Sequence, residues 1–306
     1  FLPIILSAAA MFRLYEKNTV ENTMNNVDYL LNYLSESVAN VADDMKNINA
    51  YIMEQSRVGG LFENLTEQRD GNDQSEAREE MIDDIVETVI NMNPYVKGVV
   101  FIGKDNKIHG DTRISGLLDK SYNCSYIPMV QEYLSGGLSD DFISPHKMNY
   151  YTDDTEVISF VTRFTYTDEI SETPEVLGVM FVDVYLESIG VFFDNLNKDM
   201  LSILYLADLE GDCIYSINEA WIGRRIYEYQ THRTAETSKM GDKLRFFQTK
   251  SIPAFSWTLV GGTDYDYLMG KINTVKSITF LIISIGVLAC LCLAFLGSPA
   301  FAKPIN

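Results

Sequence analysis

The fold is decided by EVISFVTRFTYT at residues 156–167 and EVLGVMFVDVYL at residues 175–186. Both stretches are rich in the β-branched and aromatic residues that favour strands. The residues between them are mostly polar and include Pro174, as expected for the tip of a hairpin. We therefore expect two long antiparallel strands at the centre of a sheet.

Further strands and short helices are predicted on both sides of this hairpin. A second group of strands begins at residue 201, after a break near residues 195–201. The additional strands are predicted at residues 96–103, 201–216 (with a turn at 208–212), 243–251 and 255–263, and the helices at 128–134 and 187–196. The fold class is therefore α+β, with two antiparallel-sheet modules in series, of which the first is larger.

The two ends of the chain indicate a membrane. Residues 278–296 read ITFLIISIGVLACLCLAFL, nineteen residues without a charge, which is about the length that crosses a ~30 Å hydrocarbon core as a helix. The first twelve residues, FLPIILSAAAMF, are also apolar, and we interpret them as the end of a first transmembrane helix rather than as the tail of a signal peptide.

A single long helix is predicted between about residues 12 and 57, where neither Pro nor Gly occurs. Its apolar residues recur in alternating steps of four and three, an unbroken heptad stripe. They are Val20, Met24, Val27, Leu31, Leu34, Val38, Val41, Met45, Ile48 and Ile52. So narrow a stripe requires a partner, and two interpretations stay open: packing along its own domain, or a dimer seam.

Composition argues against several functions. The net charge is −19, and an acidic surface repels nucleic acid, which is bound through Lys and Arg. No glycine-rich phosphate loop, paired histidines or other catalytic motif occurs, so we expect neither an enzyme nor a bound cofactor or metal. Asp208, Glu210 and Asp212 alternate around Gly211, but without the rest of a calcium loop they indicate a hairpin turn.

The layout resembles the double Cache sensor domain of YesM-like sensor histidine kinases. The segments that carry the resemblance are NPYVKGVVFIGKDNKI, VISFVTRF, VLGVMFVDVYLESI and FSWTLVGGT, with SPAFAKPIN similar to the start of a HAMP linker. This resemblance implies PAS-like (Cache) modules, each an antiparallel sheet with a helical cover and a ligand pocket. It also implies a two-component signal-transduction receptor in a bacterial cell membrane, with residues 13–276 extracellular.

The resemblance divides the chain into six parts. They are the end of the first transmembrane helix at 1–12, a long juxtamembrane signalling helix at 13–58, a membrane-distal Cache module at 59–198, a membrane-proximal Cache module at 199–270, the second transmembrane helix at 271–297 and the start of HAMP at 298–306. The expected partners are a small-molecule ligand, the membrane and a second copy of the chain, as a homodimer through the long helix, but no nucleic acid. A methyl-accepting chemoreceptor and a membrane-anchored adhesion ectodomain are the alternatives.

The candidate ligand-binding residues lie in the distal module. Asp183 interrupts an apolar strand, where a lone carboxylate must bind a ligand or pair with a neighbour such as Arg163. Aromatic side chains suited to the rim of a pocket are Tyr122, Tyr126, Tyr150 and Tyr151.

One subfamily of these modules recognises amino acids through an Arg, a Trp and a later Asp. Asp183 matches the Asp, but Ile127 and Met129 stand where the Arg and the Trp would align. The ligand class therefore stays open. A disulfide between Cys124 and Cys213 is an alternative that so few cysteines do not favour.

Overall fold

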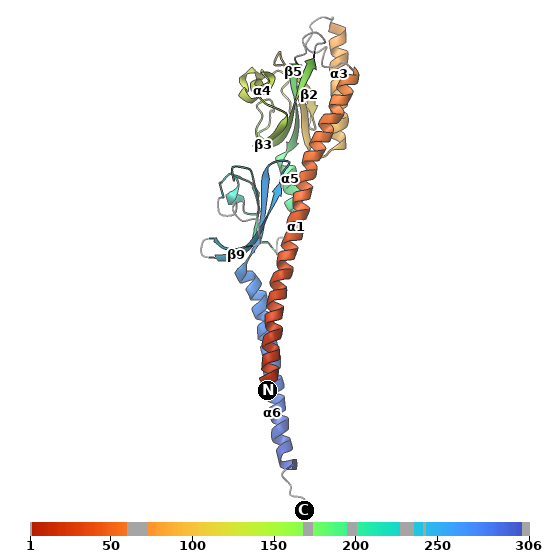
Figure 1. The fold of residues 1–306 in the computed structure, drawn as a ribbon. Coiled ribbons are helices and arrows are strands. Elements are labelled where there is room, and N and C mark those ends of the chain that lie inside the picture. Colours follow the sequence, from red (N-terminus) through yellow and green to blue (C-terminus); the bar gives the residue numbers. More distant parts are fainter. Residues whose placement is uncertain are drawn as a thin grey trace, which may run out of the picture.

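The computed structural model describes residues 2–59, 72–167, 174–194, 201–226, 236–240 and 243–301. The molecule is elongated, and one long helix runs beside two sheets that follow each other along its length (Figure 1). The sheet formed first in the sequence lies at the end away from both termini. The predicted α+β fold class, with a long N-terminal helix, two antiparallel sheets and a C-terminal apolar helix, is confirmed.

The long helix α1 spans Leu2–Gly59. Seven of the ten stripe residues are at most 2% exposed, and they are Val27, Leu31, Leu34, Val38, Val41, Met45 and Ile52. They belong to one core cluster with residues of both sheets, including Val182 and Leu259. The stripe therefore packs along its own chain and is not available there as a dimer seam. The homodimer itself stays a prediction.

The distal sheet contains five antiparallel strands in the order β2-β1-β5-β4-β3. Its strands are β1 (Val96–Gly103), β2 (Ile108–Thr112), β3 (Asp141–His146), β4 (Val157–Thr167) and β5 (Pro174–Tyr185). On one side lie α1 and α3 (Asn72–Met92), and on the other lie the short helices η1 (Cys124–Tyr126) and α4 (Pro128–Leu134) (Figure 1). The predicted central hairpin is β4–β5.

The proximal sheet also contains five antiparallel strands, in the order β7-β6-β10-β9-β8. In the chain, helix α5 (Leu186–Asp194) comes before the first strand of this sheet, and the short helix η3 (Glu219–Trp221) lies between its strands β7 and β8. Its strands are β6 (Ile203–Ala207), β7 (Cys213–Ser216), β8 (Glu236–Met240), β9 (Lys243–Ile252) and β10 (Trp257–Asp264). Its inner face packs on α1 so closely that a Cβ on Gly261 would meet Leu31 Cδ2 at 2.7 Å.

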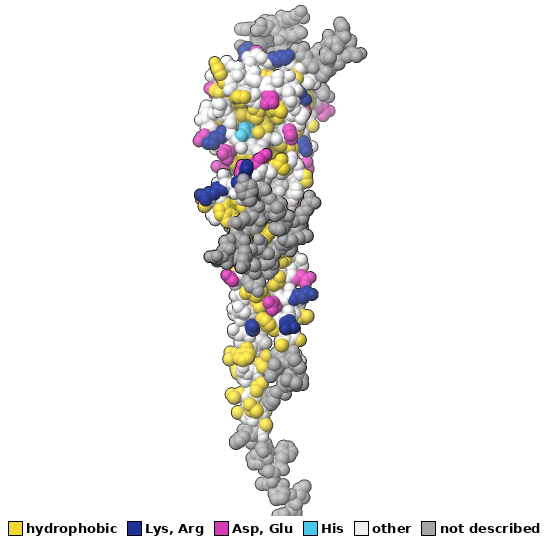
Figure 2. All heavy atoms as spheres, turned by 60° about the vertical axis from the view of Figure 1, so that its left-hand side comes forward, with side chains coloured by type: hydrophobic (Ala, Val, Ile, Leu, Met, Phe, Trp, Pro, Cys, Tyr) yellow, Lys and Arg dark blue, Asp and Glu magenta, His cyan; other side chains and the backbone are white. Residues whose placement is uncertain are grey.

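Helix α6 (Tyr265–Phe301) begins directly after β10 and descends beside the start of α1 before extending past it (Figure 1). Within the described residues one helical segment, Asp266–Ala294, is long and apolar enough to cross a membrane, and its most apolar stretch has no buried residue. Apolar side chains dominate the surface at this end of the molecule (Figure 2). The predicted first transmembrane helix ends inside α1, and its role in a membrane stays a prediction.

Candidate ligand-binding site

Asp183 lies near the middle of the distal sheet, on β5. Its direct neighbours in the strand register are Gly98 on β1 and Ser159 on β4. Because side chains alternate along a strand, Asp183 lies on the same face as Phe181 and Val179, which belong to the core beneath η1 and α4. A carboxylate is thus placed within an otherwise apolar face.

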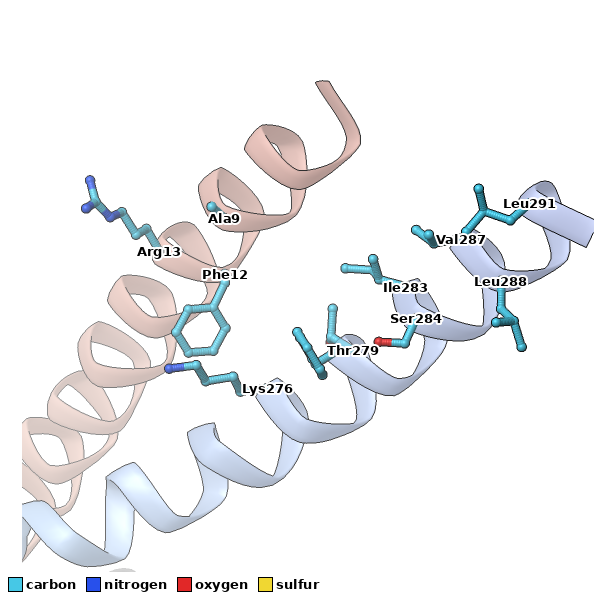
Figure 3. Close-up of a pocket in the computed structure, with 11 residues that line it drawn as sticks. Ala9, Phe12, Arg13, Lys276, Thr279, Ile283, Ser284, Val287, Leu288 and Leu291 are labelled. Carbon is cyan, nitrogen blue, oxygen red and sulfur yellow. The ribbon is translucent and has the colours of Figure 1, made fainter. Parts of the chain in front are cut away.

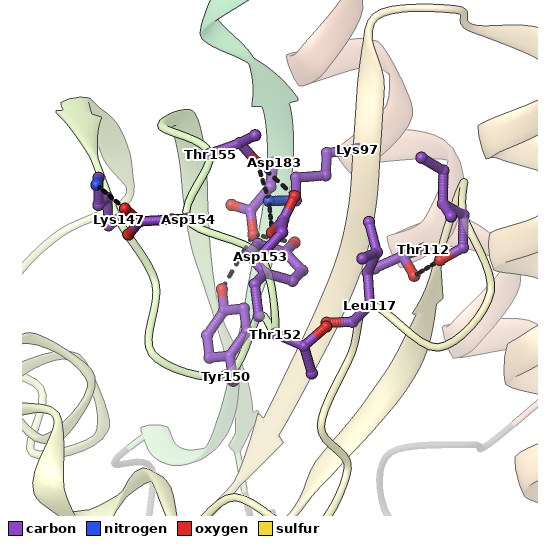
Figure 4. A network of polar contacts seen from close by, with 12 residues as sticks. Lys97, Thr112, Leu117, Lys147, Tyr150, Thr152, Asp153, Asp154, Thr155 and Asp183 are labelled. Carbon is purple, nitrogen blue, oxygen red and sulfur yellow. Dashed lines mark hydrogen bonds and ion pairs between the residues drawn. The ribbon is translucent and has the colours of Figure 1, made fainter.

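Three hydroxyl groups satisfy this carboxylate. The side chain of Asp183 is fully buried. Tyr150 Oη donates to Asp183 Oδ2 at 3.0 Å and Tyr151 Oη donates to the same atom at 2.5 Å. Ser159 Oγ donates to Oδ1. Figure 4 shows Tyr150 and Asp183 joined in this network. Three of the candidate residues, Asp183, Tyr150 and Tyr151, therefore lie together.

Burial governs the protonation of this group. Burial raises the pKa of Asp183 above its ordinary value, although hydrogen bonds from Ser159 and Tyr151 act in the opposite direction. Burial, followed by the charge of Asp183, raises the pKa of Tyr150 and of Tyr151 well above the usual tyrosine range. The tyrosines therefore act as neutral donors, and no cation bonds directly to Asp183 among the described residues.

The tyrosines reach Asp183 because residues 147–155 cross this face of the sheet, and we call these residues the covering segment. Backbone bonds fasten it to the preceding loop: Asp119 N donates to Tyr150 O at 2.8 Å, and Thr152 N donates to Leu117 O at 2.9 Å. Gly98 leaves the space beneath it, since a Cβ at this position would lie 3.0 Å from Tyr151 Oη. The network therefore depends on a residue without a side chain.

Lys97 lies beside this network and is fully buried. Its Nζ lies 2.6 Å from Asp153 Oδ1 and 2.5 Å from Thr155 Oγ1, both in the covering segment. It also lies 4.0 Å from the centre of the Tyr151 ring, a favourable cation–π geometry. Burial alone would raise the pKa of Asp153, but hydrogen bonds from Lys97 and Thr155 and the lysine charge hold that pKa below its ordinary value.

His146 joins the network from the edge strand β3. Its Nε2 lies 3.3 Å from Ser159 Oγ, and its Nδ1 lies 2.8 Å from the carbonyl oxygen of Ser144. A carbonyl oxygen only accepts, so Nδ1 carries a hydrogen. The single hydroxyl hydrogen of Ser159 goes to Asp183, so Ser159 Oγ faces Nε2 as an acceptor. The chain from β3 to the buried carboxylate is thus His146, Ser159, Asp183.

The other predicted site residues lie elsewhere. The alternative in which Arg163 pairs with Asp183 is not realised: Arg163 Nε lies 3.8 Å from Asp140 Oδ1, and its Nη1 donates to the carbonyl oxygen of Gly136. Tyr126 is 77% exposed. Tyr122 is partly buried and packs against the apolar core between the distal sheet and the helices η1 and α4. A ligand-binding role for all six residues stays a prediction.

Sequence reasoning missed Lys97, Ser159, His146 and the two partners of Lys97 in the covering segment. Lys97 carried a signal, because it is the charged residue in the strand VKGVVFIG and lone buried charges require partners. Asp153 and Thr155 gave none, since they lie in an irregular stretch.

The acidic turn at residues 208–212 and the cysteine pair Cys124 and Cys213 form neither a metal site nor a disulfide among the described residues. Asp208 Oδ1 accepts from Asp212 N at 2.7 Å, and Arg225 pairs with Asp212 at 3.1 Å, so the acidic turn is stabilised internally. The described part of the chain holds no cluster of ligating side chains suited to a metal ion. Cys124 and Cys213 are buried free thiols, and the alternative of a disulfide between them is not realised.

A groove of about 620 Å³ lies between the start of α1 and the middle of α6 (Figure 3). Phe12 and Arg13 line it from α1, and Lys276, Ile283 and Val287 line it from α6. Lys276 Nζ lies 5.0 Å from the centre of the Phe12 ring. This groove belongs to the apolar end of the molecule, far along the chain from Asp183.

Comparison with known proteins identifies the fold. No family model matches the sequence, and no curated protein matches it. Solved structures do match. The ligand-binding domain of Mlp24 with asparagine has a TM-score of 0.56 and 13% identity, covering 83% of this chain and 99% of its own. The sensory domain of the Campylobacter jejuni chemoreceptor Tlp3 with isoleucine bound has a TM-score of 0.56 and 14% identity, covering 83% and 97%.

A third match is the extracellular domain of the candidate histidine kinase vpHK1S-Z8, with a TM-score of 0.59 and 14% identity, covering 83% of this chain and 96% of its own. The chain therefore has the Cache-like fold of the sensor domains of chemoreceptors and histidine kinases. At this level of identity the likeness defines the fold.

Proposed function

We propose that this chain is the extracellular ligand-sensing part of a transmembrane signalling receptor, and that its parent is a two-component sensor histidine kinase of the YesM-like type. The observation that supports the proposal best is Asp183, a buried carboxylate satisfied only by neutral hydroxyls under a covering segment. Such a group is costly to keep ionised and gains from a ligand that brings a positive charge.

The proposed ligand is a small molecule with an ammonium group. Proteins of the same fold are described with asparagine or isoleucine, which carry this group. In this chain Ile127 and Met129 belong to or pack against the apolar core of the same module. We therefore infer that the ligand places its ammonium group on Asp183 and its apolar part toward η1 and α4.

In this proposal the module boundaries follow the sequence analysis, with residues 59–198 as the sensor and residues 199–270 as the link to the membrane. Ligand binding favours one arrangement of the sensor over another, by no more than the difference in its affinity for the two. The change passes to α1 and α6, which both extend toward the apolar end of the molecule. The chain itself performs no catalysis, so ATP hydrolysis by the purified chain would contradict this part of the proposal.

The test uses the 306-residue chain in detergent micelles. A thermal-shift screen of amino acids and simple amines identifies ligands, because a ligand that binds the folded state raises Tm. Asp183→Asn is expected to weaken binding of each hit by about tenfold or more, equivalent to ~1.4 kcal/mol. Asp105→Asn, which alters an exposed carboxylate of the same module that pairs with Lys107, is the matched control. Equal affinity for wild type and Asp183→Asn would place the ligand elsewhere.

A chemoreceptor is the second candidate, because the matching folds include the sensory domain of Tlp3. The sequence that follows residue 306 in the parent distinguishes the two. A helix with a phosphoacceptor histidine followed by an ATP-binding domain supports the kinase, and a long Glu/Gln-rich coiled coil supports the chemoreceptor.

A further inference from the structure

We propose that Lys97 is a positioning residue for Asp183: its buried ammonium group holds the covering segment down and so keeps Tyr150 and Tyr151 on the carboxylate. This inference rests on the proposed role of Asp183 as the ligand contact and identifies what sets the geometry of that contact. Lys97 reaches Asp183 only through other side chains, so it is not itself assigned to the ligand.

The first step of the argument is where Lys97 stands. The register between β1 and β5 shifts between Val96 and Gly98, so Lys97 is the extra residue of a β-bulge. Bulges redirect a side chain out of the regular alternation. Here the side chain turns into the covering segment instead of toward solvent, and none of it is exposed.

The second step is what the ammonium group touches. Its contacts are Asp153 Oδ1 at 2.6 Å, Thr155 Oγ1 at 2.5 Å and the face of the Tyr151 ring at 4.0 Å. Thr155 Oγ1 also donates to Asp153 Oδ2 at 2.7 Å. Figure 4 shows Lys97, Asp153 and Thr155 gathered beside Asp183. All three contacts lie in one segment of six residues whose first member is Tyr150.

The third step is the consequence for Asp183. Tyr151 is held from two sides, since its ring lies against Lys97 and its hydroxyl group bonds to Asp183. Without the ammonium group the ring loses one support and Asp153 is free to turn outward, because a quarter of its side chain is already exposed. The covering segment would then loosen and admit water to the carboxylate.

The same segment supplies its own control. Lys147 and Asp154 form a second ion pair at 2.8 Å, but their side chains are 49% and 92% exposed. Exposed pairs contribute little to stability. Removing this pair leaves the net charge of the chain unchanged, as removing Lys97–Asp153 does, but leaves the contacts of Tyr151 in place.

The experiment tests whether the carboxylate of Asp183 stays buried from water. The quantity measured is the Tm of the 306-residue chain in detergent micelles between pH 4 and pH 8. Because burial raises the folded-state pKa of Asp183, the stabilisation by its neutral form is present at low pH and is lost as pH rises through that pKa. The Tm of Asp183→Asn minus the Tm of wild type should therefore increase from pH 4 to pH 8.

Subtracting the two profiles removes the contributions of other groups. The titratable groups that face the network are Tyr150 and Tyr151 in the covering segment, His146 on β3, Lys97 on β1, Asp153, Cys124 in η1 and Tyr185 on β5. Within each comparison the two proteins differ only at Asp183 and share all the other groups.

Lys97→Met is expected to abolish this pH-dependent difference, so that Lys97→Met and Lys97→Met/Asp183→Asn melt in parallel across the range. Asp153→Asn should do the same, while Lys147→Met, Asp154→Asn and Lys97→Arg should preserve the wild-type difference. An undiminished difference in Lys97→Met or Asp153→Asn would overturn the proposal.

Failure of both buried-pair variants to fold, with both exposed-pair variants folded, would also overturn it, because Lys97 would then be a general support of the module. No ligand enters these measurements, so this result is independent of the test of the proposed function.

Discussion

At the scale of single residues, the site depends on side chains that are absent as much as on those that are present. Gly98 and Ser159 flank Asp183 in the register, and one supplies space while the other supplies a hydroxyl group. Gly98 is not one of the residues whose backbone φ angle is positive. Its role is therefore the close approach of Tyr151 and not chain flexibility.

Gly98→Ala is expected to lower the free energy of unfolding by about 1–3 kcal/mol, as overpacking of a filled core does. The added Cβ would lie 2.9 Å from Thr112 Cγ2, 3.0 Å from Asp111 O and 3.0 Å from Tyr151 Oη, and the tyrosine hydroxyl is the group most able to move. Denaturant unfolding measures the loss. Gly270→Ala, in an open position of α6, should not destabilise the chain.

The sequence allowed part of this site to be predicted. Asp183 is visible because a charge in an apolar strand is anomalous, and the tyrosines were named for their position in the rim. Which of the tyrosines would bond to it could not be predicted, since the path of an irregular segment has no periodicity. The same absence of pattern hid the partners of Lys97.

At the scale of elements, α1 is the support on which both sheets pack. Leu31 is fully buried and meets the backbone of β10 where Gly261 lies. The heptad stripe predicted the helix and its buried face. It could not identify the partner, because a stripe of this width suits a second helix and a sheet equally well.

Leu31→Ala should lower the free energy of unfolding by about 2–5 kcal/mol, the usual cost of a cavity left by a buried leucine. Tyr29→Ala, on the same helix but 74% exposed, should change it by no more than about 0.5 kcal/mol. Comparable losses in the two variants would mean that the outer face of α1 is covered in the folded protein.

Strand β3 shows where sequence reasoning stopped. It was not predicted, because DFISPH contains Pro145, lacks alternation and is partly exposed along its length. Proline is tolerated at the edge of a sheet, and β3 is the edge strand beside β4. Yet this strand supplies His146 to the network around Asp183.

At the scale of the whole molecule, the same strand joins the two sheets. Phe142 on β3 lies 4.8 Å from Phe160 on β4 and 4.7 Å from Phe255, measured between ring centres. Phe255 stacks on Trp257 of β10 at 4.4 Å. Lys46 of α1 lies 5.2 Å from the centre of the Phe142 ring. The distal sheet, the proximal sheet and α1 therefore meet at one aromatic contact.

Phe255→Ala is expected to separate the unfolding of the two sheets, because it removes the ring that joins them. Calorimetry of the wild type should show one transition for the sheets and the variant two, with the proximal transition at lower temperature. Tyr126→Ala, which removes an exposed ring, should leave a single transition. A single transition in Phe255→Ala would show that α1 alone couples the sheets.

The direct junction of β10 and α6 has a geometric consequence. Strand β10 ends at Asp264 and α6 begins at Tyr265, with no residue between them to absorb a mismatch. Each residue of a helix adds about 100° of rotation and 1.5 Å of rise. One residue inserted after Asp264 would therefore turn every later side chain of α6 by about 100°, whereas seven would restore its azimuth to within about 20°. The number of residues between β10 and the far end of α6 therefore fixes the direction in which the side chains at that end point, relative to the proximal sheet.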